Sequence, residues 1–192
     1  MNHKTTSIVL AGVGGQGILL ASKIIGKAAM SCGLQVKANE VHGMAQRGGS
    51  VLAQIRFGTE VYSPLVSEGS ASVLLSLEAI EAIRYKHYLC SDGLAVVSKQ
   101  RIIPVTVSSG NAVYPDVDKI LPTLFPRLIY IDALTEAEKL GESRAANIIL
   151  LGHLAKALHL PLDAWMDALK DCIKPKALAV NQKAFQLAFY EA

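Results

Sequence analysis

The sequence Thr6-Ser-Ile-Val-Leu-Ala11 runs directly into Gly12-Val-Gly-Gly-Gln-Gly17 and then into Ile18–Ser31, and this stretch decides the fold. A short β-branched apolar run is typical of a buried parallel strand. Apolar residues recur at helical spacing in Ile18–Ser31, and Cys32-Gly33 supplies the glycine that commonly ends a helix. With a second strand predicted at Leu34–Ala38, the segment forms a strand–glycine turn–helix–strand unit with a right-handed crossover.

The rest of the chain continues the alternation of strands and helices. The turn Gly58-Thr59 predicts a hairpin between Ser50–Phe57 and Glu60–Tyr62. Further strands are predicted at Ala71–Ser76, Leu94–Ser98, Pro104–Val107 and Leu128–Ile131. Helices are predicted at Glu78–Leu89, Asp116–Leu124, Ala133–Leu140, Ser143–Leu158, Pro161–Ile173 and Pro175–Tyr190. The pattern predicts one α/β domain over residues 1–192, with a mostly parallel sheet and a helical C-terminal layer.

Composition excludes several classes of protein. The 192 residues carry 19 basic and 16 acidic side chains, a formal charge of +3, which does not suit a strongly basic nucleic-acid binder. No apolar run approaches the roughly 20 residues of a membrane-spanning helix. Three widely separated cysteines predict neither a disulfide framework nor a four-cysteine iron–sulfur site, and they favour a cytoplasmic location. The spacing of His, Cys and acidic residues predicts no metal site.

The high apolar content has two interpretations. Apolar residues make up 51% of the chain and charged residues 18%. A well-filled α/β core accounts for this composition, and so does a subunit with a large permanent interface, because obligate interfaces resemble a core cut in half. The second interpretation also leaves room for self-association of the isolated chain.

The first motif has the G-x-G-x-x-G spacing in its required context, after a strand and at the start of a helix. Glycines there permit a tight turn, close approach of backbone amides to an anion, and packing of helix on strand. Glu40 lies 23 residues after Gly17, where a ribose-binding acid would lie. A nucleotide site and a purely architectural turn fit this motif equally well. The candidate binding residues are Gly12, Gly14, Gly15, Gln16, Gly17 and Glu40.

The second motif is Glu40-Val-His42-Gly-Met-Ala-Gln46-Arg47-Gly48-Gly49-Ser50, directly after the second predicted strand. It places an acid, an imidazole, an amide, a guanidinium and three glycines in eleven positions, a density that suits contact with an anion or with the active site of a partner. Arg47 is able to bind a carboxylate or phosphate through two hydrogen bonds. An ordinary solvated loop is the alternative. The further candidates are His42, Gln46, Arg47, Gly48 and Gly49, with His42 and Arg47 also candidate catalytic residues.

Together the two motifs resemble the gamma-type subunit of the 2-oxoacid:ferredoxin oxidoreductases, and most of all the small subunit of the indolepyruvate branch. The C-terminal stretches Asn147-Ile-Ile-Leu-Leu-Gly152 and Ala177-Leu-Ala-Val-Asn181-Gln-Lys-Ala-Phe185 extend the resemblance over nearly the whole chain. It implies a Rossmann-like three-layer α/β/α fold and a subunit inactive alone. It also implies oxidative decarboxylation of an arylpyruvate to its acyl-coenzyme A, with electrons passed to ferredoxin.

The resemblance further implies a division of labour between subunits. Thiamine diphosphate and [4Fe-4S] clusters belong to a large (alpha) partner subunit, coenzyme A is a co-substrate, and this chain binds no cofactor alone. Both motifs are expected at the carboxyl ends of neighbouring strands, facing the partner's active site or the coenzyme A entrance. Three alternatives stay open: a gamma subunit acting on pyruvate, 2-oxoglutarate or a branched-chain oxoacid, a free-standing dinucleotide-binding redox protein, and a scaffolding subunit.

Overall fold

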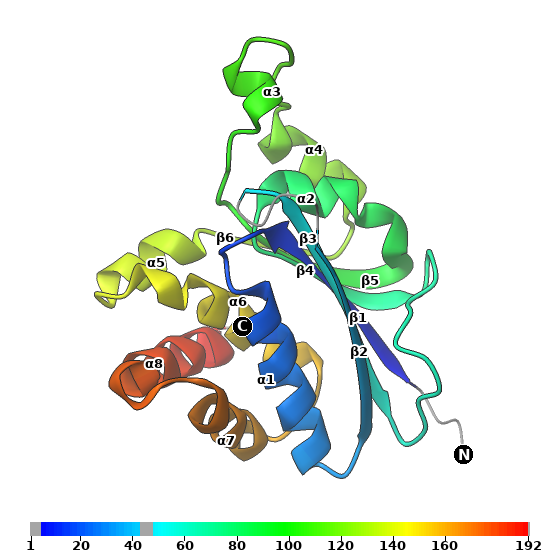
Figure 1. The fold of residues 1–192 in the computed structure, drawn as a ribbon, viewed down its shortest axis with the longest axis vertical. Coiled ribbons are helices and arrows are strands. Elements are labelled where there is room, and N and C mark those ends of the chain that lie inside the picture. Colours follow the sequence, from blue (N-terminus) through cyan, green and yellow to red (C-terminus); the bar gives the residue numbers. More distant parts are fainter. Residues whose placement is uncertain (1–4, 43–47, 192) are drawn as a thin grey trace.

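A six-stranded sheet forms the centre of the computed structural model, which describes residues 5–42 and 48–191 (Figure 1). The strands are β1 (Thr6–Val13), β2 (Gln35–His42), β3 (Ser50–Gly58), β4 (Ala71–Ser76), β5 (Leu89–Ser98) and β6 (Leu128–Ile131). The α-helices are α1 (Ile18–Ser31), α2 (Ala79–Arg84), α3 (Val105–Ser108), α4 (Val117–Leu124), α5 (Ala133–Lys139), α6 (Ala146–Ala157), α7 (Leu162–Cys172) and α8 (Pro175–Glu191). Short 3-10 turns lie at Lys86–Tyr88 and Ser143–Ala145.

The strands follow the order β2-β3-β1-β4-β5-β6. The pairs β1/β4, β4/β5 and β5/β6 are parallel, whereas β3 is antiparallel to both of its neighbours, β1 and β2. The prediction of a mostly parallel sheet is confirmed. The expectation that the first two strands are neighbours is wrong, because β3 lies between them.

Helices cover both faces of the sheet, which gives the predicted three layers (Figure 1). Successive side chains of β1 point to opposite faces, so Ile8 and Leu10 pack with α1 and the C-terminal helices, and Val9 and Ala11 pack under α2 and α4. All four side chains are fully buried. Burial on both faces explains why this strand reads as a continuous apolar run.

The C-terminal layer follows the predicted helices closely. Pro161 immediately precedes α7, and Pro175 is the first residue of α8, positions where the fixed φ of proline suits a helix start. The most buried aromatic pair lies here: Trp165 and Phe185 are fully buried, with ring centroids 5.6 Å apart. In the described part of the chain, none of the helices is long and apolar enough to cross a membrane.

Two predicted strands are not strands. Residues 60–62 form a loop whose backbone bonds to side chains rather than to a strand: the N–H of Val61 donates to Gln35 Oε1 at 3.0 Å, and just beyond it Arg56 donates to the carbonyls of Ser63 and Leu65. The hairpin partner of β3 is β2 instead. Pro104–Val107 enters the short helix α3, where Pro104 caps the turn and Val105 is 81% exposed, so no burial favours strand pairing. This helix projects from the body in Figure 1.

Candidate functional site

The glycine loop joins β1 to α1 through two glycines in left-handed backbone conformations. Gly15 has φ +104° and Gly17 has φ +85°, values that side chains other than glycine rarely adopt. Gly17 is the N-cap of α1, a 14-residue helix without a side-chain cap. The first amides of α1, which have no acceptor within the helix, and the positive end of the helix dipole therefore lie at the end of the glycine loop.

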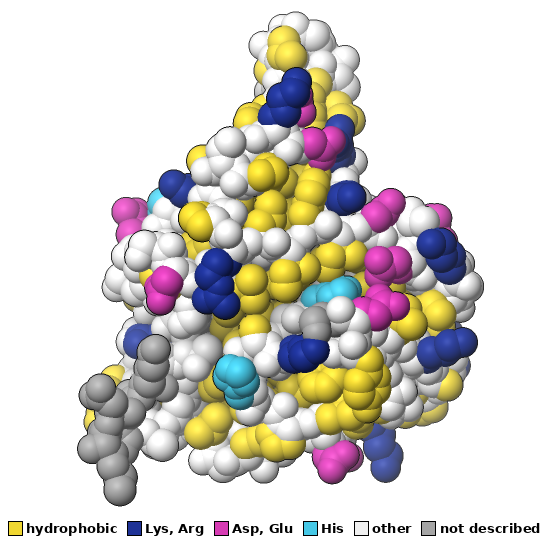
Figure 2. All heavy atoms as spheres, turned by 180° about the vertical axis from the view of Figure 1, so that it is seen from behind, with side chains coloured by type: hydrophobic (Ala, Val, Ile, Leu, Met, Phe, Trp, Pro, Cys, Tyr) yellow, Lys and Arg dark blue, Asp and Glu magenta, His cyan; other side chains and the backbone are white. Residues whose placement is uncertain are grey.

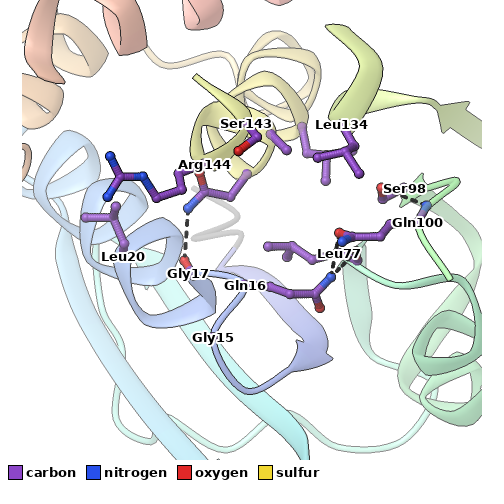
Figure 3. A pocket seen from close by; sticks show the side chains of 13 residues that line it. Gly15, Gln16, Gly17, Leu20, Leu77, Ser98, Gln100, Leu134, Ser143 and Arg144 are labelled. Atoms are coloured by element: carbon purple, nitrogen blue, oxygen red, sulfur yellow. Dashed lines mark hydrogen bonds between the residues drawn. The ribbon is translucent and has the colours of Figure 1, made fainter. Parts of the chain in front are cut away.

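Above this loop lies a cavity of about 370 Å³ at the carboxyl ends of β1, β4 and β5 (Figure 3). Along the chain, β1 leads through α1 to one side of the sheet and β4 leads through α2 to the other. Such a switch point is where open α/β sheets bind ligands. The lining residues are Gly15, Gln16, Gly17, Leu20, Leu77, Ser98, Gln100, Leu134, Ser143, Arg144, Ala146, Asn147 and Leu150.

The side chain of Gln16 ties together the ends of three strands. The backbone N–H of Val13 donates to its Oε1 at 2.7 Å, while its Nε2 donates to the Leu77 carbonyl and to Gln100 Oε1, both at 2.8 Å (Figure 3). All of its polar groups are thus engaged within the protein. Gln16 shapes the cavity floor, and the sequence pattern alone showed it only as a candidate contact for a cofactor.

Asn147 of α6 closes the other side of the glycine loop. Its Nδ2 donates to the carbonyl of Gly17 at 3.3 Å, and the residue is only 5% exposed. Its Oδ1 has no hydrogen-bond partner among the described residues. Arg144, at the rim, forms a bidentate pair with Glu142 at 2.8 and 2.9 Å, which lowers the pKa of the Glu142 carboxyl.

Replacing Gly17 by alanine is expected to destabilise the chain more than replacing Gly15. Both positions carry a left-handed penalty of about 1–2 kcal/mol. A Cβ on Gly17 would lie 2.3 Å from Asn147 Nδ2, whereas a Cβ on Gly15 meets nothing within 4 Å. The clash adds about 1–3 kcal/mol. Urea unfolding of the two variants measures the difference in stability. Equal losses of stability would show that the Asn147 side chain moves aside without a cost in free energy.

The two motifs meet through their backbones. The N–H of Gly14 donates to the carbonyl of Gly49 at 2.9 Å, and Ser50 pairs in register with Val13. Gly48 has a left-handed φ of +75°. Gln46 and Arg47 lie outside the described residues, and for His42 the structure describes only the backbone, at the end of β2 opposite Val51. The ends of the two motifs are therefore adjacent even though β1 and β2 are not.

The structure does not bring Glu40 to the glycine loop. Glu40 is opposite Ala53, and Ala53 is opposite Leu10, so the width of β3 separates Glu40 from β1. Its side chain is exposed and lines a separate groove between α1 and β2, together with Lys23 and Lys27. The first two strands of a dinucleotide-binding unit lie side by side. The inserted β3 thus removes the geometric basis for a ribose contact by Glu40.

Two buried carboxyl groups, Glu78 and Glu81, lie at the same sheet edge, and neither is among the candidate residues that the sequence indicated. Glu78 is 1% exposed and accepts hydrogen bonds from the amides of Glu81 and Ile102 and from the Tyr114 hydroxyl. Burial, together with the nearby Glu78 carboxyl, raises the pKa of Tyr114. Glu78 thus fixes the long connection between β5 and α4. Its position directly after a buried strand was the available signal.

Glu81 fixes the end of the second motif, because it accepts a hydrogen bond from Ser50. Glu81 is 4% exposed, its side chain accepts a hydrogen bond from the Ser50 hydroxyl, and its Oε1 lies 3.1 Å from Arg84 Nε. The Ser50 hydroxyl is also 2.9 Å from the Tyr85 hydroxyl. Burial raises the pKa of the Glu81 carboxyl above its ordinary value of 4.5. This cluster anchors the start of β3 beside the glycine loop.

Changing Glu81 to glutamine is expected to alter how stability depends on pH. Because burial raises the pKa of Glu81, the folded state favours the protonated carboxyl, and its contribution is complete below the unfolded pKa. That contribution is lost as the pH rises through the folded pKa. The free energy of unfolding of the wild type, minus that of Glu81→Gln, should therefore fall as the pH rises above the ordinary carboxyl pKa of 4.5. Urea unfolding at a series of pH values from 4.5 upward tests the slope, and a flat difference would contradict it.

The chain matches a known protein family over nearly its whole length. The family model for pyruvate ferredoxin/flavodoxin oxidoreductase matches residues 7–191. The chain belongs to this family. The resemblance to the gamma-type subunit of the 2-oxoacid:ferredoxin oxidoreductases is thereby confirmed, and both motifs and the cavity lie within the matched family region.

Two relatives in this oxidoreductase family extend over almost the full chain. The indolepyruvate oxidoreductase subunit IorB of Pyrococcus horikoshii is 42% identical over 96% of this chain and 94% of its own. The IorB subunit of Archaeoglobus fulgidus is 40% identical over 97% and 94%. These matches show a small subunit of a 2-oxoacid oxidoreductase rather than a free-standing dinucleotide-binding protein.

A solved structure of the same family confirms the fold. The 2-oxoglutarate:ferredoxin oxidoreductase from Magnetococcus marinus, with 2-oxoglutarate, coenzyme A and succinyl-CoA bound, superimposes with a TM-score of 0.74 at 20% identity. The match covers 98% of this chain and 32% of that chain. In that protein the same fold therefore accounts for about a third of a longer polypeptide.

Proposed function

We propose that this chain is the small subunit of an indolepyruvate:ferredoxin oxidoreductase and that it supplies part of the coenzyme A site. The 40–42% identity to two IorB subunits over nearly the whole length carries the proposal. In the reaction the bond between the carboxylate and the carbonyl carbon breaks, and carbon dioxide leaves. The acyl group joins the coenzyme A sulfur, the thiol proton is released, and two electrons pass singly to ferredoxin.

The cofactors are proposed to lie on the large partner subunit. Thiamine diphosphate stabilises the acyl carbanion when it is bound, and [4Fe-4S] clusters carry the electrons. The three cysteines of this chain lie at the ends of α1 and α7 and in β5, and among the described residues no group of three or more His, Cys, Asp and Glu is arranged to hold a metal. The described part of this chain therefore does not fit a cluster.

This chain's own contribution is proposed to be binding and orientation of coenzyme A. The cavity at the carboxyl ends of β1, β4 and β5 takes part of the co-substrate, and the N-terminus of α1 lies beside it, with Gly17 among the lining residues. Arg47 and His42 of the second motif contact an anionic group of coenzyme A. The Gly14–Gly49 hydrogen bond supports this proposal, because it joins the two motifs at one edge.

Exposed apolar side chains on the surface support a role as a subunit that binds a large partner. Large apolar side chains are exposed on several elements, including Met30 at 62%, Tyr62 at 86%, Val105 at 81% and Val113 at 91%. Figure 2 shows hydrophobic side chains gathered in broad patches on the face opposite that of Figure 1. Exposed apolar patches of this kind mark interaction sites. We place the partner on apolar surface of this chain, and ferredoxin reaches the enzyme through the complex.

Anaerobic reconstitution tests the proposal. The chain is combined with the large thiamine and iron–sulfur subunit encoded beside it, and ferredoxin or viologen reduction is followed with indolepyruvate and coenzyme A. We expect activity only in the complex, with pyruvate and 2-oxoglutarate as poorer substrates. A preference for one of these would assign another member of the family. A large subunit that is fully active alone would overturn the proposal, as would reduction of a nicotinamide by this chain.

A further inference from the structure

Strand β2 forms one edge of the sheet, and among residues 5–42 and 48–191 no strand pairs with its outer side. It has eight residues, Gln35–His42, whereas β6 at the other edge has four, Leu128–Ile131. A very short edge strand is one of the ways in which proteins keep other chains from pairing with a sheet. β2 is too long for this protection, so its outer side is open to an added strand.

The hydrogen bonds of β3 show which backbone groups of β2 face outward. The N–H of Gly14 donates to the carbonyl of Gly49, which makes these residues a hydrogen-bonded pair that continues the register of β1 with β3. Such pairs alternate along an antiparallel ladder, so odd-numbered residues of β3 bond to β1 and even-numbered ones bond to β2. The even-numbered residues of β3 are opposite the odd-numbered residues of β2. The N–H and carbonyl groups of Val36, Ala38 and Glu40 therefore point away from the sheet.

A groove beside α1 follows the same three residues. Val36, Ala38 and Glu40 line it together with apolar side chains of α1, among them Leu19, which is 40% exposed, and Met30, which is 62% exposed. A strand added at this edge hydrogen-bonds to the outward backbone groups and places alternate side chains against the groove. Main-chain pairing combined with contacts for alternate side chains is how sheet edges bind extended segments of other proteins.

The charges around the groove favour a partner with an acidic side chain. Lys27 is bound by Asp171 at 2.7 Å, but Lys23, which is exposed one turn earlier on α1, has no ion pair among the described residues. A second copy of this chain would bring a second Lys23 to the same side of the sheet, because the two-fold axis of an antiparallel strand pair keeps equivalent faces together. A different chain that supplies a carboxylate is therefore the better occupant.

We propose that the outer edge of β2 pairs with an extended strand of the large partner subunit. This strand hydrogen-bonds to the backbones of Val36, Ala38 and Glu40, sets apolar side chains against the groove, and brings a carboxylate to Lys23. The inference rests on the proposed function, since it takes the large subunit of the oxidoreductase as the partner. Glu40 and His42 belong to the second motif, so this pairing brings the partner to the edge where coenzyme A is proposed to bind.

Hydrogen exchange of backbone amides, compared between the free chain and the active complex, tests the pairing. The odd-numbered amides of β2 are already bonded to β3 in the free chain. We expect the amides of Val36, Ala38 and Glu40 to exchange at least about 10-fold more slowly in the complex, and the odd-numbered amides to change less. Unchanged exchange at these three amides in a complex that turns over would overturn the inference alone.

Two other outcomes would also overturn the strand pairing. Slow exchange at the same three amides in the free chain, at concentrations where it forms a dimer, would assign the edge to a second copy. A chain that forms no complex with the large subunit would contradict the proposed function, and this inference with it. The oligomeric state of the free chain and of the mixture, measured by light scattering, distinguishes these two outcomes.

Variants of the edge give an independent measure through affinity. Ala38→Pro removes an outward N–H but no hydrogen bond to β3, and edge strands accept proline at such positions. We expect the Kd for the large subunit to rise about 10-fold, while Ala38→Ser, which keeps the N–H, binds like the wild type. Lys23→Glu should weaken binding as well, whereas Lys183→Glu, the same charge change on α8, should not. Equal Kd values for a folded Ala38→Pro chain and for Ala38→Ser would contradict the pairing.

Discussion

Replacing Gln16 by leucine is expected to lower kcat/KM for coenzyme A by about 100-fold in the assembled enzyme, the size of loss that a misplacement of about 1 Å produces. Leucine has the volume of glutamine but leaves the Val13 N–H and the Leu77 carbonyl without their partners. The ends of β1, β4 and β5 then lose the side chain that joins them, and the glycine loop shifts. Because Gln16 acts by positioning, KM for coenzyme A should rise while KM for the oxoacid stays constant.

Gln54→Leu is the matched control for this change. Gln54 is 5% exposed and its Oε1 accepts from the amide of Val66 at 3.1 Å, so its loss also leaves a buried N–H unsatisfied. It lies opposite Val9, well within β3 and away from the cavity. Both variants should lose about 1–3 kcal/mol of stability, but only Gln16→Leu should change the kinetics. Equal kcat/KM in the two variants would assign Gln16 a purely structural role.

The parts of the fold that could be predicted depend on local sequence. The bounds of α1 match the prediction from Ile18 to Ser31, because left-handed glycines lie just before and after it at Gly17 and Gly33. The bounds of β4 and β6 match as well. Both are short, mainly apolar runs, of which β4 is buried along nearly its whole length and β6 is half-buried throughout. Such signals require no knowledge of the rest of the molecule.

The features of the fold that could not be predicted depend on which distant segments of the chain pair or pack together. The pattern of Ser50–Gly58 predicts a strand but does not say that the strand enters between β1 and β2. That insertion separates Glu40 from the glycine loop. Likewise, Glu81 looks solvated until Ser50, 31 residues away, donates to it. Long-range pairing is set by competition among strands, which composition and periodicity do not reveal.

In the candidate site, too, the local features could be predicted from the sequence and the long-range contacts could not. Sequence spacing located the glycine loop correctly at the carboxyl end of a strand, and the second motif ends beside it. It did not indicate Gln100 or Asn147, because each is an ordinary polar residue within its own segment. Only the folded chain brings Gln100, after β5, and Asn147, at the start of α6, to one cavity. The orientation of the Gln100 amide follows from its contact with the Gln16 side chain, 84 residues away in sequence, and that of the Asn147 amide from its contact with the Gly17 carbonyl, 130 residues away.

Trp165→Ala is expected to produce the largest loss of stability, about 3–5 kcal/mol. The indole is fully buried between α7 and the ring of Phe185 on α8, so alanine leaves a cavity that its neighbours only partly fill. For a chain of this size the loss corresponds to a fall in Tm of roughly 10 °C. Since Trp165 is the only tryptophan, unfolding must be followed by circular dichroism rather than by fluorescence.

Trp165→Phe separates the volume of the indole from its polar atom. Phenylalanine keeps an aromatic ring against Phe185 but removes Nε1, which is buried without a partner among the described residues. Removing an unsatisfied donor recovers about 1–3 kcal/mol and offsets the smaller loss of volume. We expect this variant to remain within about 1 kcal/mol of the wild type. A loss as large as that of Trp165→Ala would show that Nε1 makes a hydrogen bond in solution, and that the layer of α7 and α8 beneath α1 depends on it.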